Sequence, residues 1–177
     1  MKYQRMIMEV ESPEQIGYEK VVVNLAESSM RDRTLEDVGL KPDDLANVLL
    51  NYGDHRGSEM ARTLIAAEAG GALAPTDVLV AVGAAGALFL VATAILNPGD
   101  GLVVVRPNYA SNLETPRAIG ADITYVELAH ESGYRLDPDQ IAAAITPNTR
   151  LVSITTPHNP TGAIIPADDL QQIVEIT

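Results

Sequence analysis

Residues 155–162 have the sequence TTPHNPTG and join an apolar run, LVSI at 151–154, to a helix start, PADDL at 166–170. We interpret the apolar run as a buried strand, so the eight residues form a loop at its carboxyl end. Ligands bind outside this end of the strands in open α/β sheets. Two prolines and a glycine make the loop stiff and tightly turned, and a stiff loop can hold the amide of Asn159 in one position. The alternative is a connection that only turns the chain.

Segments on both sides of this loop alternate between strand and helix patterns. Such alternation is typical of right-handed βαβ units and a sheet with much parallel pairing, and continuous apolar strands fit a sheet covered on both faces. The predicted fold class is α/β, a three-layer α/β/α arrangement with a mostly parallel sheet. The predicted strands are 78–82, 102–105, 123–126 and 151–154; the predicted helices are 84–96, about 107–119 with Pro116 kinking or shortening it, one opened by Asp137 and Pro138, and one that begins near Pro166.

The N-terminal segment has weaker periodicity. A short strand at 21–25 and helical turns at 34–38 and 42–45 are expected, and residues 1–45 are predicted to pack as an N-terminal arm or small-domain segment. Ser58 can cap a helix whose apolar face we expect to be Met60, Leu64 and Ile65, with Ala61 at its margin. Residues 46–177 are predicted to form the N-terminal part of a larger domain, because the chain ends within a helix after only four clear strands.

Composition excludes several classes of function. The chain has 177 residues, of which 46% are hydrophobic and 20% charged, and a net charge of −12. It is therefore globular rather than disordered, and its acidity argues against binding to nucleic acid or to an anionic membrane surface. The absence of cysteine excludes disulfides and thiolate metal sites. No signal peptide is expected, and residues 84–96 are too short for the roughly 20 residues of a membrane span, so we predict a buried helix there and a cytoplasmic protein.

Three loops are expected at the same edge of the sheet: Gly83–Gly86, Arg106–Tyr109 and Thr155–Gly162. The first is rich in small residues and opens a helix, so its free backbone N–H groups make a phosphate site plausible. The second places the ring of Tyr109 just after a proline, and the third offers the amide of Asn159. A phosphate cradle, a flat ring and an amide donor together suit a flat, phosphorylated heterocycle.

Other kinds of site fit less well. The glycines at 83–86 superficially resemble a dinucleotide fingerprint, but the G-x-G-x-x-G order is absent and residues 102–106 offer no acid for a ribose. His55, His130 and His158 are scattered without the i, i+4 pairing of a helical metal site. A noncatalytic binding module is the alternative from a different class, because no nucleophile occupies a convincing setting.

Several motifs occur in the order and spacing of a known family. They are Tyr52-Gly53 before a helix, VGA at 82–84, NPGD at 97–100, PNY at 107–109 and PHNPTG at 157–162. On these residues the chain resembles the N-terminal half of a class I/II aminotransferase, a pyridoxal 5′-phosphate enzyme of fold type I. The resemblance covers roughly 50–177 well and 1–49 loosely, and it implies that residues 46–177 belong to the pyridoxal-phosphate-binding large domain.

The resemblance implies roles for five residues. Gly83 and Ala84 look like backbone donors to the cofactor phosphate, Tyr109 like the ring stacked on the pyridine, and Asn159 like the amide that donates to its phenolic oxygen. Tyr52 is similar to the tyrosine that reaches the cofactor phosphate of a neighbouring subunit, which implies a homodimer. In this family the prolines matching Pro107 and Pro160 commonly follow cis peptide bonds.

The sequence also departs from the family pattern. Val82 stands where the family often has Ser or Thr, and Met60-Ala61-Arg62 replaces the usual Leu-Arg. The Schiff-base lysine, the aspartate facing the pyridine nitrogen and the arginine that binds the substrate carboxylate are expected beyond Thr177, so no catalytic residue is assigned in this chain and it is expected to be inactive alone. Residues 24–29 and 31–33 lie where the family's arm passes the substrate; a solvated arm is the alternative.

The resemblance thus implies an enzyme that moves an amino group between an amino acid and a 2-oxo acid, both small molecules, with pyridoxal phosphate as cofactor. A lyase, cyclase or decarboxylase of the same fold and an inactive binding fragment are the alternatives.

Overall fold

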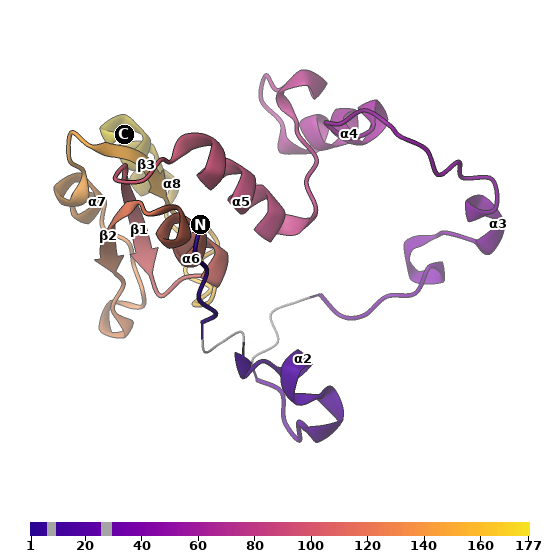
Figure 1. Cartoon of the computed structure of the whole chain (residues 1–177), viewed down its shortest axis with the longest axis horizontal. Coiled ribbons are helices and arrows are strands. Elements are labelled where there is room, and N and C mark those ends of the chain that lie inside the picture. Colours follow the sequence, from indigo (N-terminus) through magenta and orange to yellow (C-terminus); the bar gives the residue numbers. More distant parts are fainter. Residues whose placement is uncertain (7–9, 26–29) are drawn as a thin grey trace. The chain divides into compact units, whose positions relative to one another are not determined.

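The structure, a computed structural model, describes residues 1–6, 10–25 and 30–177 of the chain. These residues belong to two compact units (Figure 1). The first, which we call the sheet unit, consists of Met1–Ala26 and Ala85–Thr177; the second is the Glu27–Ala84 unit. The arm and domain boundary expected near residue 45 remain predictions.

A parallel three-stranded sheet forms the centre of the sheet unit. Its strands are β1 (Gly101–Arg106), β2 (Asp122–Glu127) and β3 (Thr149–Ser153), in the order β2-β1-β3. Both neighbours pair with β1 in parallel, with Leu102 opposite Ile123 on one side and Leu151 on the other. The apolar sequence of β1 explains its central position, since Leu102–Val105 are at most 1% exposed. Three of the four strands predicted after residue 50 are therefore confirmed, as is the parallel pairing.

Helices cover both faces of this sheet, which confirms the three-layer α/β/α prediction. Side chains alternate between the faces along each strand. One face packs against α7 (Pro138–Ala144) and α8 (Ala167–Ile176), and the other against α6 (Ala110–Ile119) (Figure 1). The first cluster comprises Val103, Val105, Val126, Leu128, Leu136, Ile141 and Ile173, and the second Leu102, Val104 and Leu113 with Met6, Ile123 and Leu151 packed beside them.

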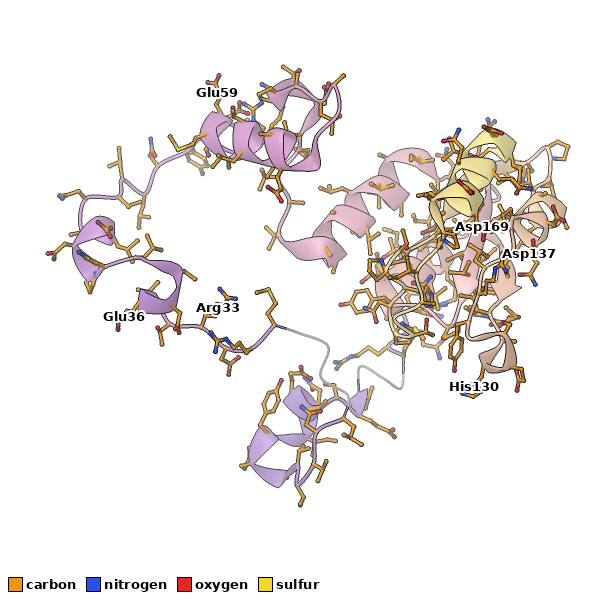
Figure 2. All side chains as sticks on the ribbon, turned by 180° about the vertical axis from the view of Figure 1, so that it is seen from behind. Arg33, Glu36, Glu59, His130, Asp137 and Asp169 are labelled. Carbon is orange, nitrogen blue, oxygen red and sulfur yellow. The ribbon has the colours of Figure 1, made fainter. Side chains whose placement is uncertain are left out.

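Local signals set several helix ends. The Asp137 carboxylate accepts a hydrogen bond from the Asp139 N–H at 3.0 Å, and Pro138 occupies the first position of α7, as the sequence predicts. Arg135, just before this cap, pairs with Asp169 of α8 at 3.2 Å; Figure 2 labels Asp137 and Asp169. Pro116 does not shorten α6, which continues to Ile119 and ends at Gly120 in a left-handed conformation.

The Glu27–Ala84 unit is built around a buried arginine. Its elements are η2 (Glu36–Val38), α3 (Pro42–Leu45), α4 (Glu59–Ala69) and η3 (Pro75–Asp77). The hydroxyl of Ser58 caps α4 by accepting from the Ala61 N–H. Arg62 of α4 is 4% exposed and donates to the carbonyls of Gly57 and Pro75, at 3.0 and 2.8 Å, and to Asp54 at 3.0 Å.

The prediction of which side chains form the buried face of α4 is wrong within this unit. Met60, Leu64 and Ile65 are exposed, whereas Arg62 and Ala66 are buried. Each guanidinium nitrogen of Arg62 finds a carbonyl or carboxylate oxygen, and a paired charge tolerates burial that an unpaired one does not. Hydrophobic periodicity alone does not detect this kind of packing.

Two predicted strands are absent from the described residues, at 78–82 and 21–25. A strand needs a neighbour to pair with its backbone groups. Within 78–82, the Val80 N–H donates to the Arg56 carbonyl at 2.8 Å, which is an isolated bond rather than a ladder. Residues 21–25 contain highly exposed apolar side chains, including Val22 and Leu25. The short elements α2 (Pro13–Ile16) and η1 (Tyr18–Lys20) precede these residues.

The apolar helix α5 (Gly83–Ile95) forms where it is predicted but is not buried as predicted. Ala92 is buried within it, whereas Phe89, Leu90 and Val91 are each at least 40% exposed. A helix that is apolar on all sides needs neighbours around most of its circumference, and the described residues cover only one side of α5. None of the helices in the described ranges has the length and apolar character needed to cross a membrane.

The buried arginine generates a stability prediction. Replacing Arg62 by Met in the complete natural chain should lower the free energy of local opening of α4 by about 2–3 kcal/mol, because three hydrogen bonds of a charged group are lost. Hydrogen exchange of residues 57–77 measures this. Arg56→Met is the matched control: Arg56 also pairs with Asp54, at 3.4 Å, but is half exposed, and its loss should cost under about 1 kcal/mol. Equal effects of the two changes would contradict the assigned role of Arg62.

Candidate active site

The loops that follow β1 and β3 lie at one edge of the sheet. Both strands are paired in parallel, so their carboxyl ends meet at this edge, where ligands bind in open α/β sheets. The first loop carries Tyr109 and the second carries Asn159. The loops touch, because the imidazole of His158 lies beside the backbone carbonyl of Pro107. The Arg106–Pro107 and Asn159–Pro160 peptide bonds are both cis, as the family resemblance predicts, and Thr156–Pro157 is also cis.

Backbone hydrogen bonds close the loop that carries Asn159. The N–H of His158 donates to the carbonyl of Ala163, and the N–H of Gly162 donates to the carbonyl of His158, both at 2.7 Å. Gly162 has φ +74°, a conformation that favours glycine. Asn159 lies within this turn and its side chain is exposed. The amide is therefore presented to solvent on a loop whose backbone is held on both sides.

His158 is buried beneath this turn. It is 4% exposed, and its Nδ1 lies 2.8 Å from the hydroxyl of Thr161. Among the described residues its Nε2 has no hydrogen bond of good geometry. Burial lowers the pKa of His158 from the ordinary value, and the carbonyl of Pro107 offsets part of that effect. Burial therefore favours the neutral form of the imidazole, which lies between the two loops. In the sequence alone, His158 is one of three scattered histidines. Its position between Pro157 and Pro160 is the feature that could have indicated its burial.

Tyr109 occupies the position just before α6 and is 41% exposed. Its N–H donates to the side-chain oxygen of Asn108 at 2.7 Å. Its ring is therefore accessible while its backbone is held. The structure brings Tyr109 and Asn159 to the same edge of the sheet unit.

The other predicted site residues, Gly83, Ala84 and Tyr52, belong to the Glu27–Ala84 unit. Gly83 begins α5 with φ +68°, and an added Cβ there would meet no atom within 4 Å. The first N–H groups of a helix lack intrahelical partners, so Gly83 and Ala84 present donors suited to an anion. Tyr52 is 98% exposed.

Comparison with known proteins identifies the family. Residues 20–177 match the family described as aminotransferase class I and II, and the chain belongs to this family. It is 35% identical over 130 residues to the arginine–pyruvate transaminase AruH of Pseudomonas aeruginosa, covering 71% of this chain and 33% of that protein. It is 37% identical over 109 residues to the aspartate/prephenate aminotransferase of Thermus thermophilus, covering 62% of this chain and 28% of that protein.

Solved structures similar to this chain are also aminotransferases. A PLP-dependent aminotransferase from Streptococcus suis matches 99% of this chain and 48% of its own, with a TM-score of 0.87 and 28% identity. The N-succinyldiaminopimelate aminotransferase from Mycobacterium tuberculosis matches 76% of this chain and 36% of its own, with a TM-score of 0.70 and 34% identity. The chain spans about a third of the length of the curated relatives it matches.

Family membership implies pyridoxal phosphate as the cofactor, and the residues present fit part of it. An exposed aromatic ring and an exposed amide lie at one sheet edge, and a glycine-led helix start offers N–H donors. These groups are chemically suited to a pyridine face, a phenolic oxygen and a phosphate. The chain's lysines do not complete the set, because Lys2, Lys20 and Lys41 are exposed and none follows a strand of the sheet.

Burial of His158 predicts a pH dependence of stability. Because its pKa is lowered in the folded chain from the ordinary 6.5, the unfolded chain binds more protons below that pH, and stability must fall as the pH drops through it. We expect the unfolding midpoint in denaturant to decrease below pH 6.5, and His158→Gln to flatten this dependence.

His55→Gln is the control for this prediction, since the His55 side chain is exposed. It should leave the pH profile of the unfolding midpoint unchanged. A His158→Gln variant with the same acid sensitivity as the wild type would show that His158 is not the responsible group.

Proposed function

We propose that the protein transfers an amino group between an amino acid and a 2-oxo acid with pyridoxal phosphate as cofactor. The observation that carries this proposal is the location of Tyr109 and Asn159 in loops at the same carboxyl edge of a parallel sheet, in a chain whose residues 20–177 match the aminotransferase family. The named relatives act on different amino-group donors, so the proposal extends to the substrate class alone. The cytoplasmic location expected from the sequence remains a prediction.

Each residue would contribute a separate part of cofactor binding. The ring of Tyr109 would lie against the pyridine face and fix its plane, since stacked aromatic rings favour an offset arrangement. The amide of Asn159 would donate to the phenolic oxygen and favour its anion. The N–H groups of Gly83 and Ala84 would bind the phosphate. When bound, pyridoxal phosphate supplies the electron sink for the reaction at the substrate's α-carbon.

The described residues provide no group placed to move the substrate's α-proton. Transamination needs a positioned amine for this step, and the three lysines of the chain are exposed and do not follow a strand of the sheet. Val82 also offers no hydroxyl to a phosphate. We therefore propose that residues 1–177 hold one wall of the site and do not transaminate alone, whereas the complete natural chain does.

The function is tested with the complete natural chain and with residues 1–177, each purified and supplied with pyridoxal phosphate. The complete chain should acquire a visible absorption band, retain the cofactor covalently after borohydride reduction and transfer amino groups from an amino acid to a 2-oxo acid. Residues 1–177 should show none of these. Failure of the complete chain to bind the cofactor, or turnover by residues 1–177 with cofactor attached to Lys2, Lys20 or Lys41, would overturn the proposal.

Two substitutions in the complete chain test the assigned roles. Tyr109→Ala should weaken cofactor binding about tenfold, because the stacking contact is lost. Asn159→Ala should raise the pH at which the absorption of the bound cofactor changes, because the phenolic anion loses a donor. Tyr18→Ala, at an exposed tyrosine of η1, is the control and should leave both unchanged. Spectral titrations measure both effects, and unchanged values in the two site variants would remove these residues from the site.

A homodimer is part of the proposal. Tyr52 is almost fully exposed, which is consistent with a tyrosine that reaches a neighbouring subunit's cofactor. Light scattering of the complete natural chain should give twice the monomer mass, and Tyr52→Phe should weaken cofactor binding by removing one hydroxyl donor to the phosphate. An active monomer would contradict this assignment.

A further inference from the structure

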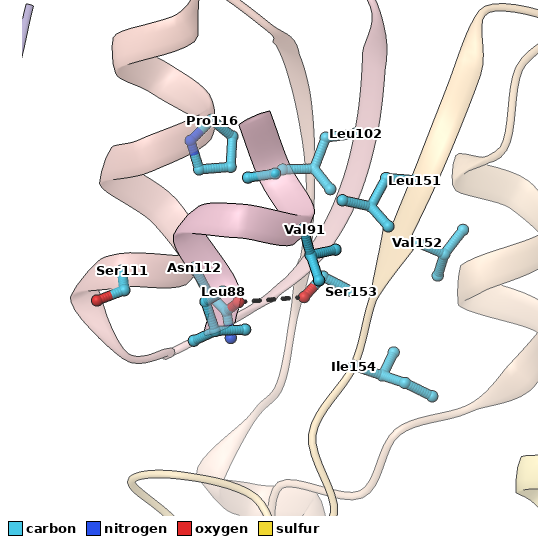
Figure 3. Close-up of a pocket in the computed structure, with 11 residues that line it drawn as sticks. Leu88, Val91, Leu102, Ser111, Asn112, Pro116, Leu151, Val152, Ser153 and Ile154 are labelled. Atoms are coloured by element: carbon cyan, nitrogen blue, oxygen red, sulfur yellow. Dashed lines mark hydrogen bonds between the residues drawn. The ribbon is translucent and has the colours of Figure 1, made fainter. Parts of the chain in front are cut away.

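A buried chain of amide and hydroxyl groups lies behind Tyr109. Asn108, which is 4% exposed, follows β1, and Asn112 is buried in the first turn of α6. The hydroxyl of Ser153, the last residue of β3, completes the set; Figure 3 shows Asn112 and Ser153 joined by a hydrogen bond. These residues come from the loop after β1, from α6 and from β3, so the chain of groups connects the elements from which the two site loops leave. We call them the asparagine network.

Two hydrogen bonds of the network converge on the side-chain oxygen of Asn108. The side-chain oxygen of Asn108 accepts from the N–H of Tyr109 at 2.7 Å and from Nδ2 of Asn112 at 3.0 Å. The Nδ2 of Asn108 donates to the carbonyl of Val105 at 3.0 Å. This pattern fixes the orientation of the Asn108 amide, since a flip would turn its NH₂ group toward two donors and its oxygen toward a carbonyl.

Asn112 is held from its other side as well. Its side-chain oxygen accepts from the hydroxyl of Ser153 at 3.3 Å, and its backbone N–H donates to the carbonyl of Tyr109 at 3.0 Å. Tyr109 is therefore tied on both of its backbone polar groups, by Asn108 at the N–H and by Asn112 at the carbonyl. Its side chain remains exposed beyond this anchored backbone.

We propose that Asn108, held by Asn112, is the positioning residue for Tyr109. This inference rests on the proposed function. The network fixes the backbone of Tyr109 relative to both strands before any cofactor arrives, so the peptide that carries the ring does not have to be ordered at the moment of binding. Ordering a loop on binding opposes association, and a ring carried on an anchored backbone binds more tightly than one on a free loop.

The test uses the complete natural chain with pyridoxal phosphate as the probe. Asn112→Asp is nearly isosteric but places a carboxylate oxygen opposite the acceptor oxygen of Asn108, which pushes that oxygen away from the Tyr109 N–H. The dissociation constant should rise about tenfold. Thr115→Val is the matched control, because Thr115 is the other buried polar side chain of α6; it should change the constant by no more than about twofold.

A double-mutant cycle separates positioning of Tyr109 from a general structural role. In a Tyr109→Ala background, Asn112→Asp should change the dissociation constant by less than about twofold, because the ring that the network positions is already gone. Amide hydrogen exchange of Tyr109 without cofactor should become faster in Asn112→Asp and in Asn108→Leu. If Asn108→Leu does not fold, the cycle with Asn112→Asp still decides.

The failure of this inference differs from the failure of the proposed function. A wild-type protein that does not bind pyridoxal phosphate overturns both. A wild type that binds it, with Asn112→Asp weakening binding by the same factor with and without the Tyr109 ring, overturns the positioning role alone. Unchanged exchange of the Tyr109 amide in the variants does the same.

Discussion

Parallel pairing of β1 with a neighbour on each side is the interaction on which the rest of the sheet unit depends. It buries Leu102–Val105 almost completely and satisfies the backbone of β1 on both edges, which matters because unpaired buried backbone groups are costly. The same pairing brings the carboxyl ends of β1 and β3 together, so the loops of Tyr109 and Asn159 share one edge. Neither loop contains a regular element of its own; both depend on where the strands end.

Polar groups buried at this edge lock the two loops in different ways. The asparagine network joins β1, α6 and β3 through side-chain hydrogen bonds. A buried polar network whose donors have acceptors adds rigidity. His158 is wedged beneath the other loop as a neutral ring, with Nδ1 bonded to Thr161 and its pKa lowered by burial. The charged Arg106 points elsewhere, to Glu127 and over the ring of Tyr125 with 3.9 Å to the ring centroid. This edge of the sheet therefore presents uncharged donors and the ring of Tyr109, while the charge of Arg106 is paired with Glu127.

The sequence could predict the features that depend on residues close to one another along the chain. The run at 102–105 is apolar enough to be a central strand in any packing, and Asp137 with Pro138 starts a helix through contacts within a few residues. The cis bonds at Pro107 and Pro160 followed from motif resemblance. Tyr109 and Asn159 were singled out by their place in loops after strands, and their roles remain proposals. By contrast, 78–82 has a strand's composition but finds no ladder partner, and α5 has a buried helix's composition but lies partly uncovered. Both failures concern neighbours distant in sequence. Arg62 and His158 were missed because periodicity counts them as polar. Oxygen atoms outside α4 permit the burial of Arg62, and Nδ1 of His158 is bonded to Thr161 within its own loop.

The central claim is that this sheet edge forms part of a pyridoxal phosphate site, and a crystal structure of the complete natural chain with the cofactor tests it most directly. The account predicts the pyridine ring against Tyr109, the amide of Asn159 within about 3 Å of the phenolic oxygen, and the phosphate at the N–H groups of Gly83 and Ala84. A cofactor bound away from the loops after β1 and β3, with Tyr109 and Asn159 free of it, would contradict the account.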